Sequence, residues 1–362
     1  MTTPRLQIDL KKIHNNTTRL VECLGAKGIT VTGVTKVALG SPEIAKTMLS
    51  AGVKSIGDSR IENIQTMREA GISAKFILLR TPQISRVDQV VKYADTSLNT
   101  ELKVIEKLSQ SAIEQSKIHQ VVLMIELGDL REGILQSNLD EIVRQTLQLS
   151  GIRIEGIGTN LACLGGVKPN HQKMQQLSEL AQSLEAKFKI KLETVSGGNS
   201  ANFDWFFSTT DTARINNLRL GESIFLGCET LNRKPIEGLN TDAIVLVTEV
   251  IESNVKPSVP LGEVGQSAFE ENPEFRDRGL INHAILGIGR QDVLISGLTP
   301  LSEDIVVFGA SSDHLIVIAN KRRLHIGEEV SFHLNYGALL AAMTSPYVEK
   351  VYLREGLENH SQ

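Results

Sequence analysis

Short apolar runs alternate with longer segments of helical periodicity from about residue 6 to residue 235. The runs are rich in β-branched residues and apolar on both faces, which is typical of strands buried in a parallel sheet. The segments between them, such as 101–115, 139–149 and 172–187, carry apolar side chains at helical spacing. The predicted strands are 29–35, 53–57, 75–79, 95–98, 121–127, 152–158, 192–196 and 218–221.

Eight strand–helix units in roughly 230 residues are what a (β/α)8 TIM barrel requires. A doubly wound open sheet is the competing α/β architecture. No Gly-x-Gly-x-x-Gly sequence follows an early strand, so the open sheet is the weaker alternative. We therefore predict a TIM barrel over residues 6–235.

The pattern changes after Pro235. Five short strand-like runs follow, separated by turns that contain proline or glycine, and no long helical pattern lies between them. These runs are 243–250, 283–287, 305–308, 315–318 and 329–334. We predict a separate C-terminal β domain over residues 236–362, which residues 1–10 could join.

Composition excludes several classes of protein. The net charge of −4, without a basic stripe, argues against nucleic acid as a partner. No apolar run reaches the roughly 18 residues needed to cross a membrane, and the N-terminus has no hydrophobic signal core. The three cysteines, Cys23, Cys163 and Cys228, are odd in number and widely spaced. They indicate a reducing compartment without disulfides or a zinc site, so we expect a soluble cytoplasmic protein that binds no metal.

The first candidate for chemistry is Lys36. It stands where the first predicted strand ends, ahead of Gly40 and the helix-start sequence Ser41-Pro-Glu. Barrel enzymes place reactive groups at the C-terminal ends of strands, and a desolvated lysine there can lose its proton and form a Schiff base. The alternative is a lysine that only extends from a strand end into solvent.

The second candidate is the glycine-rich turn Ser196-Gly-Gly-Asn-Ser200 after the seventh strand. Its backbone N–H groups and the Ser200 hydroxyl would form an anion site, and barrels often bind phosphate after strands 7 and 8. A plain loop with a serine cap is the alternative. A lysine and a phosphate site on these strands together suggest pyridoxal phosphate.

The strand ends and the β domain contain an ordered set of motifs. They are Gly33-Val-Thr-Lys36, Gly57-Asp-Ser-Arg-Ile-Glu-Asn63, Gly128-Asp-Leu-Arg-Glu-Gly-Ile134, Gly158-Thr-Asn-Leu161, Ser196-Gly-Gly-Asn-Ser200, Asn217-Leu-Arg-Leu-Gly-Glu222, Gly289-Arg-Gln-Asp-Val293, Gly309-Ala-Ser-Ser-Asp-His314 and Asn335-Tyr-Gly-Ala-Leu339. Over nearly its whole length the chain resembles the fold-type III pyridoxal-phosphate enzymes, the alanine racemase family, and within it the ornithine racemase branch.

The resemblance implies roles for individual residues. Lys36 matches the lysine that holds the cofactor, and Arg131 matches an arginine near the substrate carboxylate. The cofactor-binding set implied by the motifs is Lys36, Asn199, Ser200, Arg219, Gly221, Glu222 and Tyr336, with Ser200, Gly221 and Tyr336 at the phosphate.

Arg219 matches an arginine that faces the pyridine nitrogen of the cofactor. An arginine stays protonated, so it donates to the ring nitrogen, keeps that nitrogen unprotonated and makes the cofactor a weaker electron sink. In the related decarboxylases a glutamate stands at this place. By resemblance, Arg219 therefore favours racemisation over decarboxylation.

The chain also departs from alanine racemase. Asn160 stands where that enzyme has a histidine, and Gly40 and Ile288 stand where it has tyrosines. Racemisation needs one group on each face of Cα, because a proton leaves one face and another returns to the opposite face. Lys36 can serve one face, and the residue for the other face is unassigned.

Candidates for the remaining roles lie in the β domain. Ser312 replaces the cysteine of a decarboxylase motif, and His314 is a further candidate acid/base. Asp313 keeps the motif's aspartate, which suits the distal ammonium of ornithine, and Asp292 is a second candidate for that contact. A solvated turn is the alternative for Asp313 and His314.

We therefore expect a pyridoxal-phosphate racemase that interconverts L- and D-ornithine, or a similar basic amino acid. The resemblance also implies a homodimer in which partner residues complete the active site. The alternatives are an alanine or broad-specificity racemase, a decarboxylase, and a non-catalytic pyridoxal-phosphate homeostasis protein. The predicted β domain counts against the last of these.

Overall fold

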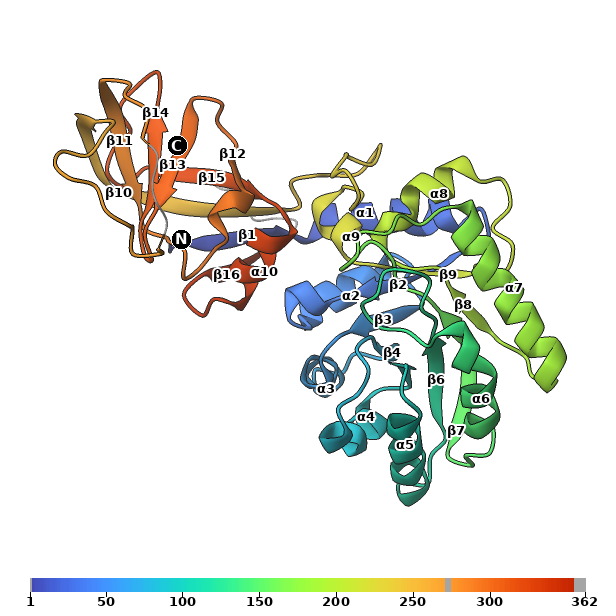
Figure 1. Ribbon diagram of the computed structural model, residues 1–362. Helices are drawn as coiled ribbons and strands as arrows, with labels where there is room; N and C mark the ends of the chain where they lie inside the picture. Colours follow the sequence, from blue (N-terminus) through green and yellow to red (C-terminus); the bar gives the residue numbers. More distant parts are fainter. Residues whose placement is uncertain (1, 271–274, 355–362) are drawn as a thin grey trace. The chain divides into compact units, whose positions relative to one another are not determined.

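The structure is a computed structural model that describes residues 2–270 and 275–354. The chain folds into two units (Figure 1). The barrel unit covers Lys12–Thr241, and the C-terminal unit combines residues up to Lys11 with those from Asp242 onward. Residues 236–241 therefore belong with the barrel. No helix among the described residues is both long enough and apolar enough to cross a membrane.

The barrel unit contains a closed barrel of eight parallel strands in sequence order. Its strands are β2 (Thr30–Val34), β3 (Ser55–Asp58), β4 (Lys75–Leu78), β5 (Thr96–Asn99), β6 (His119–Met124), β7 (Ile152–Gly158), β8 (Thr194–Ser196) and β9 (Asn217–Leu220). Pairing of β2 with β9 closes the ring, with Thr30 opposite Asn217. The predicted TIM barrel is thus confirmed, and each predicted strand has its counterpart.

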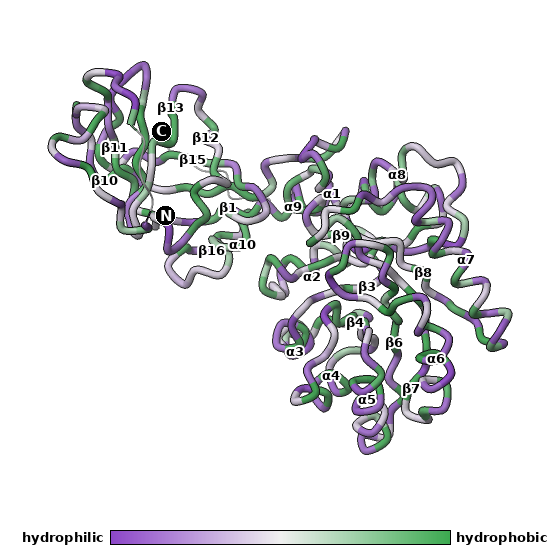
Figure 2. The backbone as a smooth tube through the Cα atoms, in the orientation of Figure 1, coloured by the Kyte–Doolittle hydropathy of each residue, from purple (hydrophilic) through white to green (hydrophobic). Residues whose placement is uncertain are grey.

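Helices follow the strands and surround the barrel in Figure 1. They are α1 (Leu10–Gly25), α2 (Pro42–Ser50), α3 (Ile61–Glu69), α4 (Val87–Tyr93), α5 (Leu102–Glu114), α6 (Gln136–Thr146), α7 (His171–Phe188), α8 (Phe203–Ser208) and α9 (Glu222–Leu226), with 3-10 turns η1 (Lys36–Ala38), η2 (Ile84–Arg86) and η3 (Ser200–Asn202). In Figure 2 these helices change between green and purple along their length, as amphipathic helices do.

The barrel interior is polar over much of its circumference. A cavity of about 150 Å³ lies inside it, lined by residues from every strand. Glu155 accepts hydrogen bonds there from Lys75 Nζ at 2.5 Å and from Thr96 Oγ1 at 2.7 Å. Arg219 also lines this cavity. A buried arginine can be tolerated here because the surrounding side chains can accept its hydrogen bonds.

The C-terminal unit is a largely antiparallel sheet with one helix among its described residues, which confirms the predicted β architecture. Its elements are β1 (Arg5–Asp9), β10 (Ile244–Pro257), β11 (Leu280–Leu286), η4 (Ile295–Gly297), β12 (Leu298–Pro300), β13 (Ile305–Ala310), β14 (Leu315–Ala319), β15 (Glu329–Leu334), α10 (Tyr336–Thr344) and β16 (Glu349–Leu353). β1 pairs antiparallel with β10 and parallel with β16. The helix α10 was not predicted; it follows the last of the five predicted strand runs.

Candidate active site

Lys36 lies in a tight turn at the C-terminal end of β2. The strand ends at Val34, and Lys36 begins the 3-10 turn η1. Leu39 and Gly40 then adopt left-handed backbone conformations, with φ of 53° and 66°. A Cβ on Gly40 would lie 2.6 Å from the Asn63 Cβ, so the turn requires glycine there. A tyrosine at this position would collide with Asn63.

Asp58 anchors this turn to the end of β3. Its carboxylate is fully buried and accepts hydrogen bonds from Thr35 Oγ1 at 2.8 Å and Asn63 Nδ2 at 2.9 Å. Burial raises the pKa of Asp58, although these hydrogen bonds oppose the rise. Because Thr35 directly precedes Lys36, the carboxylate fixes the backbone that carries the lysine.

Ionisable groups from four other strand ends influence Lys36. Burial is the main cause that lowers the pKa of Lys36. Cys163 and Asp58 oppose this change, whereas Arg131 and Arg219 reinforce it. The side chain is exposed at the barrel end yet crowded by protein atoms. A lysine in these surroundings gives up its proton more readily than a surface lysine.

Arg219, on β9, is 6% exposed and firmly held. Its Nη1 donates to Ser196 Oγ at 2.5 Å, and its Nη2 donates to the Thr159 carbonyl at 2.8 Å. Burial, reinforced by Arg131, lowers the pKa of Arg219 to about 10. The guanidinium therefore remains charged at neutral pH and acts as a fixed hydrogen-bond donor.

The glycine-rich turn brings the loops after β8 and β9 together. Ser200 is 2% exposed, and its Oγ lies 3.0 Å from Ser223 Oγ and accepts a hydrogen bond from Ser223 N at 3.3 Å. Asn199 caps η3, since its Oδ1 accepts a hydrogen bond from Ala201 N at 2.8 Å. A Cβ on Gly221 would lie 3.0 Å from the Val34 carbonyl oxygen. The two loops therefore meet next to the end of β2.

Arg131 and Cys163 form a contact between the loops after β6 and β7. Arg131 Nη1 donates to Cys163 Sγ at 2.7 Å, and the guanidinium also pairs with Glu132. The Glu132 hydrogen bond, which outweighs burial, raises the pKa of Arg131. Asn160 lies beside this contact: with its amide oxygen turned toward Arg131, it accepts from both Nη atoms at 3.2 Å.

Glu222, at the start of α9, forms an ion pair with Arg233. Burial is the main cause that raises the pKa of Glu222, and the charges of Arg233 and Lys36 oppose it. The carboxylate, which is 12% exposed, is thus electrostatically coupled to Lys36.

The remaining candidates belong to the C-terminal unit. Asp292 is 5% exposed and accepts a hydrogen bond from Ser345 Oγ at 2.7 Å. Tyr336 begins α10, which Asn335 caps. Ile288 is a buried core residue.

Ser312, Asp313 and His314 lie in the turn between β13 and β14. Asp313 Oδ1 is 3.1 Å from both Ser312 Oγ and His314 Nδ1. The hydrogen bond from Ser312 is the main cause that lowers the pKa of Asp313. Because the Asp313 side chain is 57% exposed, it is available to a ligand.

No role was assigned to Asp58 or Cys163 from the sequence. Asp58 stands within the motif that begins at Gly57, and Cys163 follows closely after the motif that ends at Leu161. The one available signal was their position after strand ends. Within the described residues, no cluster of three or more His, Cys, Asp or Glu side chains could hold a metal.

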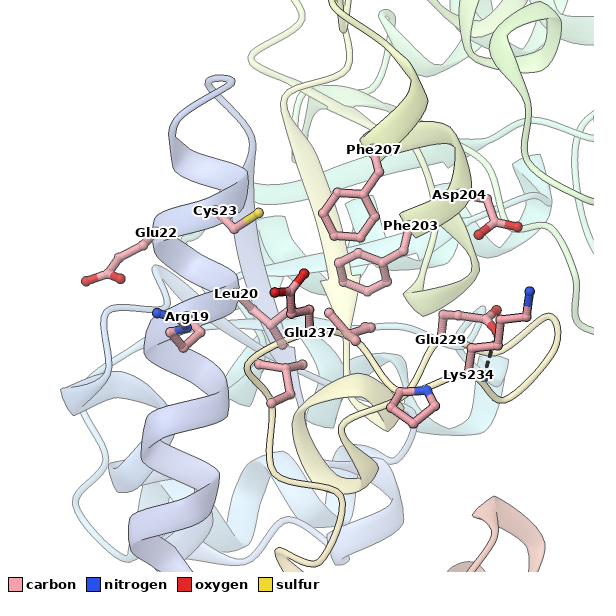
Figure 3. Close-up of a pocket in the computed structure, with 13 residues that line it drawn as sticks. Arg19, Leu20, Glu22, Cys23, Phe203, Asp204, Phe207, Glu229, Lys234 and Glu237 are labelled. Carbon is pink, nitrogen blue, oxygen red and sulfur yellow. Dashed lines mark hydrogen bonds between the residues drawn. The ribbon is translucent and has the colours of Figure 1, made fainter.

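A separate cavity of about 760 Å³ lies in the barrel unit between α1, α8 and the segment 229–239 (Figure 3). Phe203 and Phe207 form one wall, and Cys23 and Arg19 come from α1. None of the candidate site residues lines it. Despite its size, this cavity is therefore distinct from the group of side chains at the strand ends.

Comparison with known proteins places these features in a family. The sequence profile described as "Alanine racemase, N-terminal domain" matches residues 8–228. An ornithine racemase of Acetoanaerobium sticklandii is 38% identical over 353 residues, which cover 97% of this chain and 99% of that protein. A lysine racemase of Thermotoga maritima has the same identity and coverage. The alanine racemase structure of Bacillus anthracis superposes with a TM-score of 0.76 at 15% identity, covering 98% of this chain and 96% of that one.

Proposed function

The chain belongs to the alanine racemase family, and from this premise we propose that it is a pyridoxal-phosphate-dependent racemase of a basic amino acid, ornithine or lysine. The observation that carries the proposal is Lys36, whose pKa is lowered at the mouth of the barrel beside Arg131 and Arg219. The identity of the substrate rests on the two racemases that match the chain over both units.

The residues at the strand ends fit pyridoxal phosphate. Lys36 supplies an amine that can lose its proton, and Arg219 supplies a buried cation that can only donate hydrogen bonds. The Ser200 hydroxyl and the loop at Gly221 supply small polar groups suited to a phosphate. When bound, this cofactor withdraws electrons from Cα of the amino acid and makes its proton removable.

The protein side chains then have distinct tasks. We assign Lys36 to hold the cofactor and to exchange a proton with one face of Cα. Arg219 would orient the ring by donating to its nitrogen, and Asn199, Ser200, Gly221 and Glu222 would hold the cofactor in the barrel unit. The family resemblance implies that Tyr336 also belongs to the cofactor-binding set. We assign Arg131 to bind the substrate carboxylate through its guanidinium.

A basic substrate also needs a partner for its distal ammonium. Between the two candidate aspartates, Asp313 is the exposed one, whereas the Asp292 carboxylate is buried and bonded to Ser345. We therefore propose Asp313 as the contact. Ser312 and His314, which neighbour it, remain proposed acid/base candidates.

The proposal extends to the state of the protein in the cell. We propose a homodimer, because the family resemblance implies that partner residues complete the site. The three cysteines are unpaired, which supports a reducing, cytoplasmic location. Light scattering on the purified protein tests the dimer.

A chiral amino-acid assay tests the function. The purified protein, with pyridoxal phosphate added, receives L-ornithine, L-lysine, L-arginine and L-alanine in parallel. We expect D-ornithine or D-lysine to form, Lys36→Ala to abolish the reaction, and the control Lys46→Ala, an exposed lysine of α2, to retain it. A cofactor-loaded protein that inverts none of the four would refute the proposal, and release of carbon dioxide would replace it with a decarboxylase.

A further inference from the structure

A racemase needs two acid/base groups, and the proposed function places Lys36 at one face of Cα. The second group must approach Cα from the opposite face. Ile288 cannot serve because it is a buried alkyl side chain. Among the described residues at the barrel mouth, Cys163 carries a free, exposed thiol, which is a group that can donate and accept a proton.

We propose that Cys163 is the second acid/base, exchanging a proton with the face of Cα opposite to Lys36. This inference rests on the proposed racemase function. Within the closed barrel, β6 stands four strands from β2 in either direction, and β7 is its neighbour. Because Arg131 follows β6 and Cys163 follows β7, the two residues lie at strand ends across the barrel from the end of β2 that carries Lys36.

The loop that carries Cys163 is held in one conformation by Asp129. The Asp129 carboxylate accepts hydrogen bonds from the backbone N–H groups of Cys163 at 3.2 Å, Leu164 at 2.9 Å and Val167 at 3.2 Å. Burial by itself would raise the pKa of Asp129, but these bonds together outweigh it and lower the pKa. A side chain on such a clamped loop keeps its position through a reaction, so Asp129 acts as a positioning residue.

Arg131 contacts the thiol directly. Its Nη1 donates to Cys163 Sγ at 2.7 Å, so the sulfur can hold the negative charge that remains when its proton leaves. The charge of Cys163 also acts on Lys36, where it opposes the fall in pKa that burial causes.

Proton transfer balances between them. In one direction the Cys163 thiolate takes the Cα proton and becomes a thiol, while the Lys36 ammonium delivers a proton to the opposite face and becomes an amine. In the other direction the roles reverse. No oxidant or other reagent is needed.

Alkylation of the cofactor-free protein gives a readout that does not depend on activity. Iodoacetamide labelling of Cys163 and Cys23, both exposed, is followed by mass spectrometry, with Cys23 as the internal reference. We expect Arg131→Gln to slow labelling of Cys163 severalfold and to leave Cys23 unchanged. We also expect pyridoxal phosphate with ornithine to protect Cys163 alone. Equal labelling of the two thiols under all conditions would overturn the inference.

Isotope exchange separates a catalytic from a structural role. In D2O, we expect Cys163→Ala to lower racemisation by about 10²–10⁴-fold, yet to exchange the Cα hydrogen of one enantiomer without inverting it. The control Cys23→Ala should behave as wild type, and Ser312→Ala and His314→Asn are tested alongside.

The outcomes are distinct. A structural role would slow exchange of both enantiomers equally, which would overturn the inference, as would a Cys163→Ala enzyme that racemises within threefold of wild type. Ser312→Ala or His314→Asn could instead be the variant that loses inversion and keeps Cα exchange of one enantiomer. That result would assign the second acid/base to Ser312 or His314 and overturn the inference. A wild-type protein that racemises nothing would refute the proposed function, and this inference with it.

Discussion

Acid should destabilise the barrel through His119, the first residue of β6. This side chain is 2% exposed, and its Nε2 lies 2.8 Å from Ser97 Oγ. Burial, reinforced by the charge of Lys117, lowers the pKa of His119 from 6.5 to about 4. Between those values the unfolded chain binds a proton that the folded protein excludes. The contribution of His119 to the free energy of unfolding is therefore fully present above pH 6.5 and is lost as the pH falls toward 4.

The magnitude follows from the two pKa values. The difference between 6.5 and about 4 corresponds to roughly 3 kcal/mol of unfolding free energy over the whole range. By pH 5 about 2 kcal/mol of this should already be lost. Carboxylates titrate in the same pH range, so the contribution of His119 must be isolated by comparison with a variant that has no titratable side chain at position 119.

Urea unfolding at pH 7.5 and pH 5 measures this contribution. His119→Gln removes the titrating ring and keeps an amide that can bond to Ser97, while His171→Gln changes an exposed histidine of α7 as the control. We expect wild type and His171→Gln to lose about 2 kcal/mol more than His119→Gln between the two pH values. An equal loss in all three proteins would refute the reasoning.

Two further predictions concern the turn that carries Lys36. Gly40→Ala should lower the free energy of unfolding by about 2–5 kcal/mol, because of the left-handed backbone and the collision with Asn63. Gly71 also has a left-handed backbone, but a Cβ there would meet nothing, so calorimetry should show a smaller loss for Gly71→Ala. Equal losses in the two variants would contradict the collision. Thr35→Val should cost about 1–3 kcal/mol in urea unfolding, because it removes a donor from the buried Asp58 carboxylate. Thr35→Ser, which keeps the hydroxyl, should restore most of this, and failure to do so would show that the methyl group is what matters.

Much of the fold could be predicted from the sequence because eight short strand-like runs alternate with segments of helical periodicity. The failures have physical causes. β6 ends at Met124 rather than at residue 127, since Glu126 N donates to the Ile134 carbonyl and the chain turns to pair with its own loop. The helix α10 is apolar over most of its surface and so shows no helical periodicity. β1 and β16 are short: β1 pairs with both β10 and β16, and β16 pairs with β1.

The candidate site was predictable to the extent that it follows from barrel topology. Lys36, Arg131 and Arg219 stand at strand ends, and a closed parallel barrel brings those ends together. Cys163 could not be placed in the same way, because its position depends on a loop conformation held by Asp129, with Ala162 in the left-handed region. Sequence spacing does not report such loop geometry.

The pairing of β1 determines when this strand can form its hydrogen bonds during synthesis of the chain. On the ribosome, the barrel has all of its strands once β9 has emerged, because every pairing in its ring lies between residues 30 and 220. β1 is made before all of them, yet its partners β10 and β16 are made after. The backbone N–H and C=O groups of β1 therefore stay unpaired while the whole barrel is synthesised. During that time they could pair with a strand of a neighbouring nascent chain. The polar residues Arg5, Gln7 and Asp9, which alternate along β1, are the kind that discourage such mispairing while the strand waits.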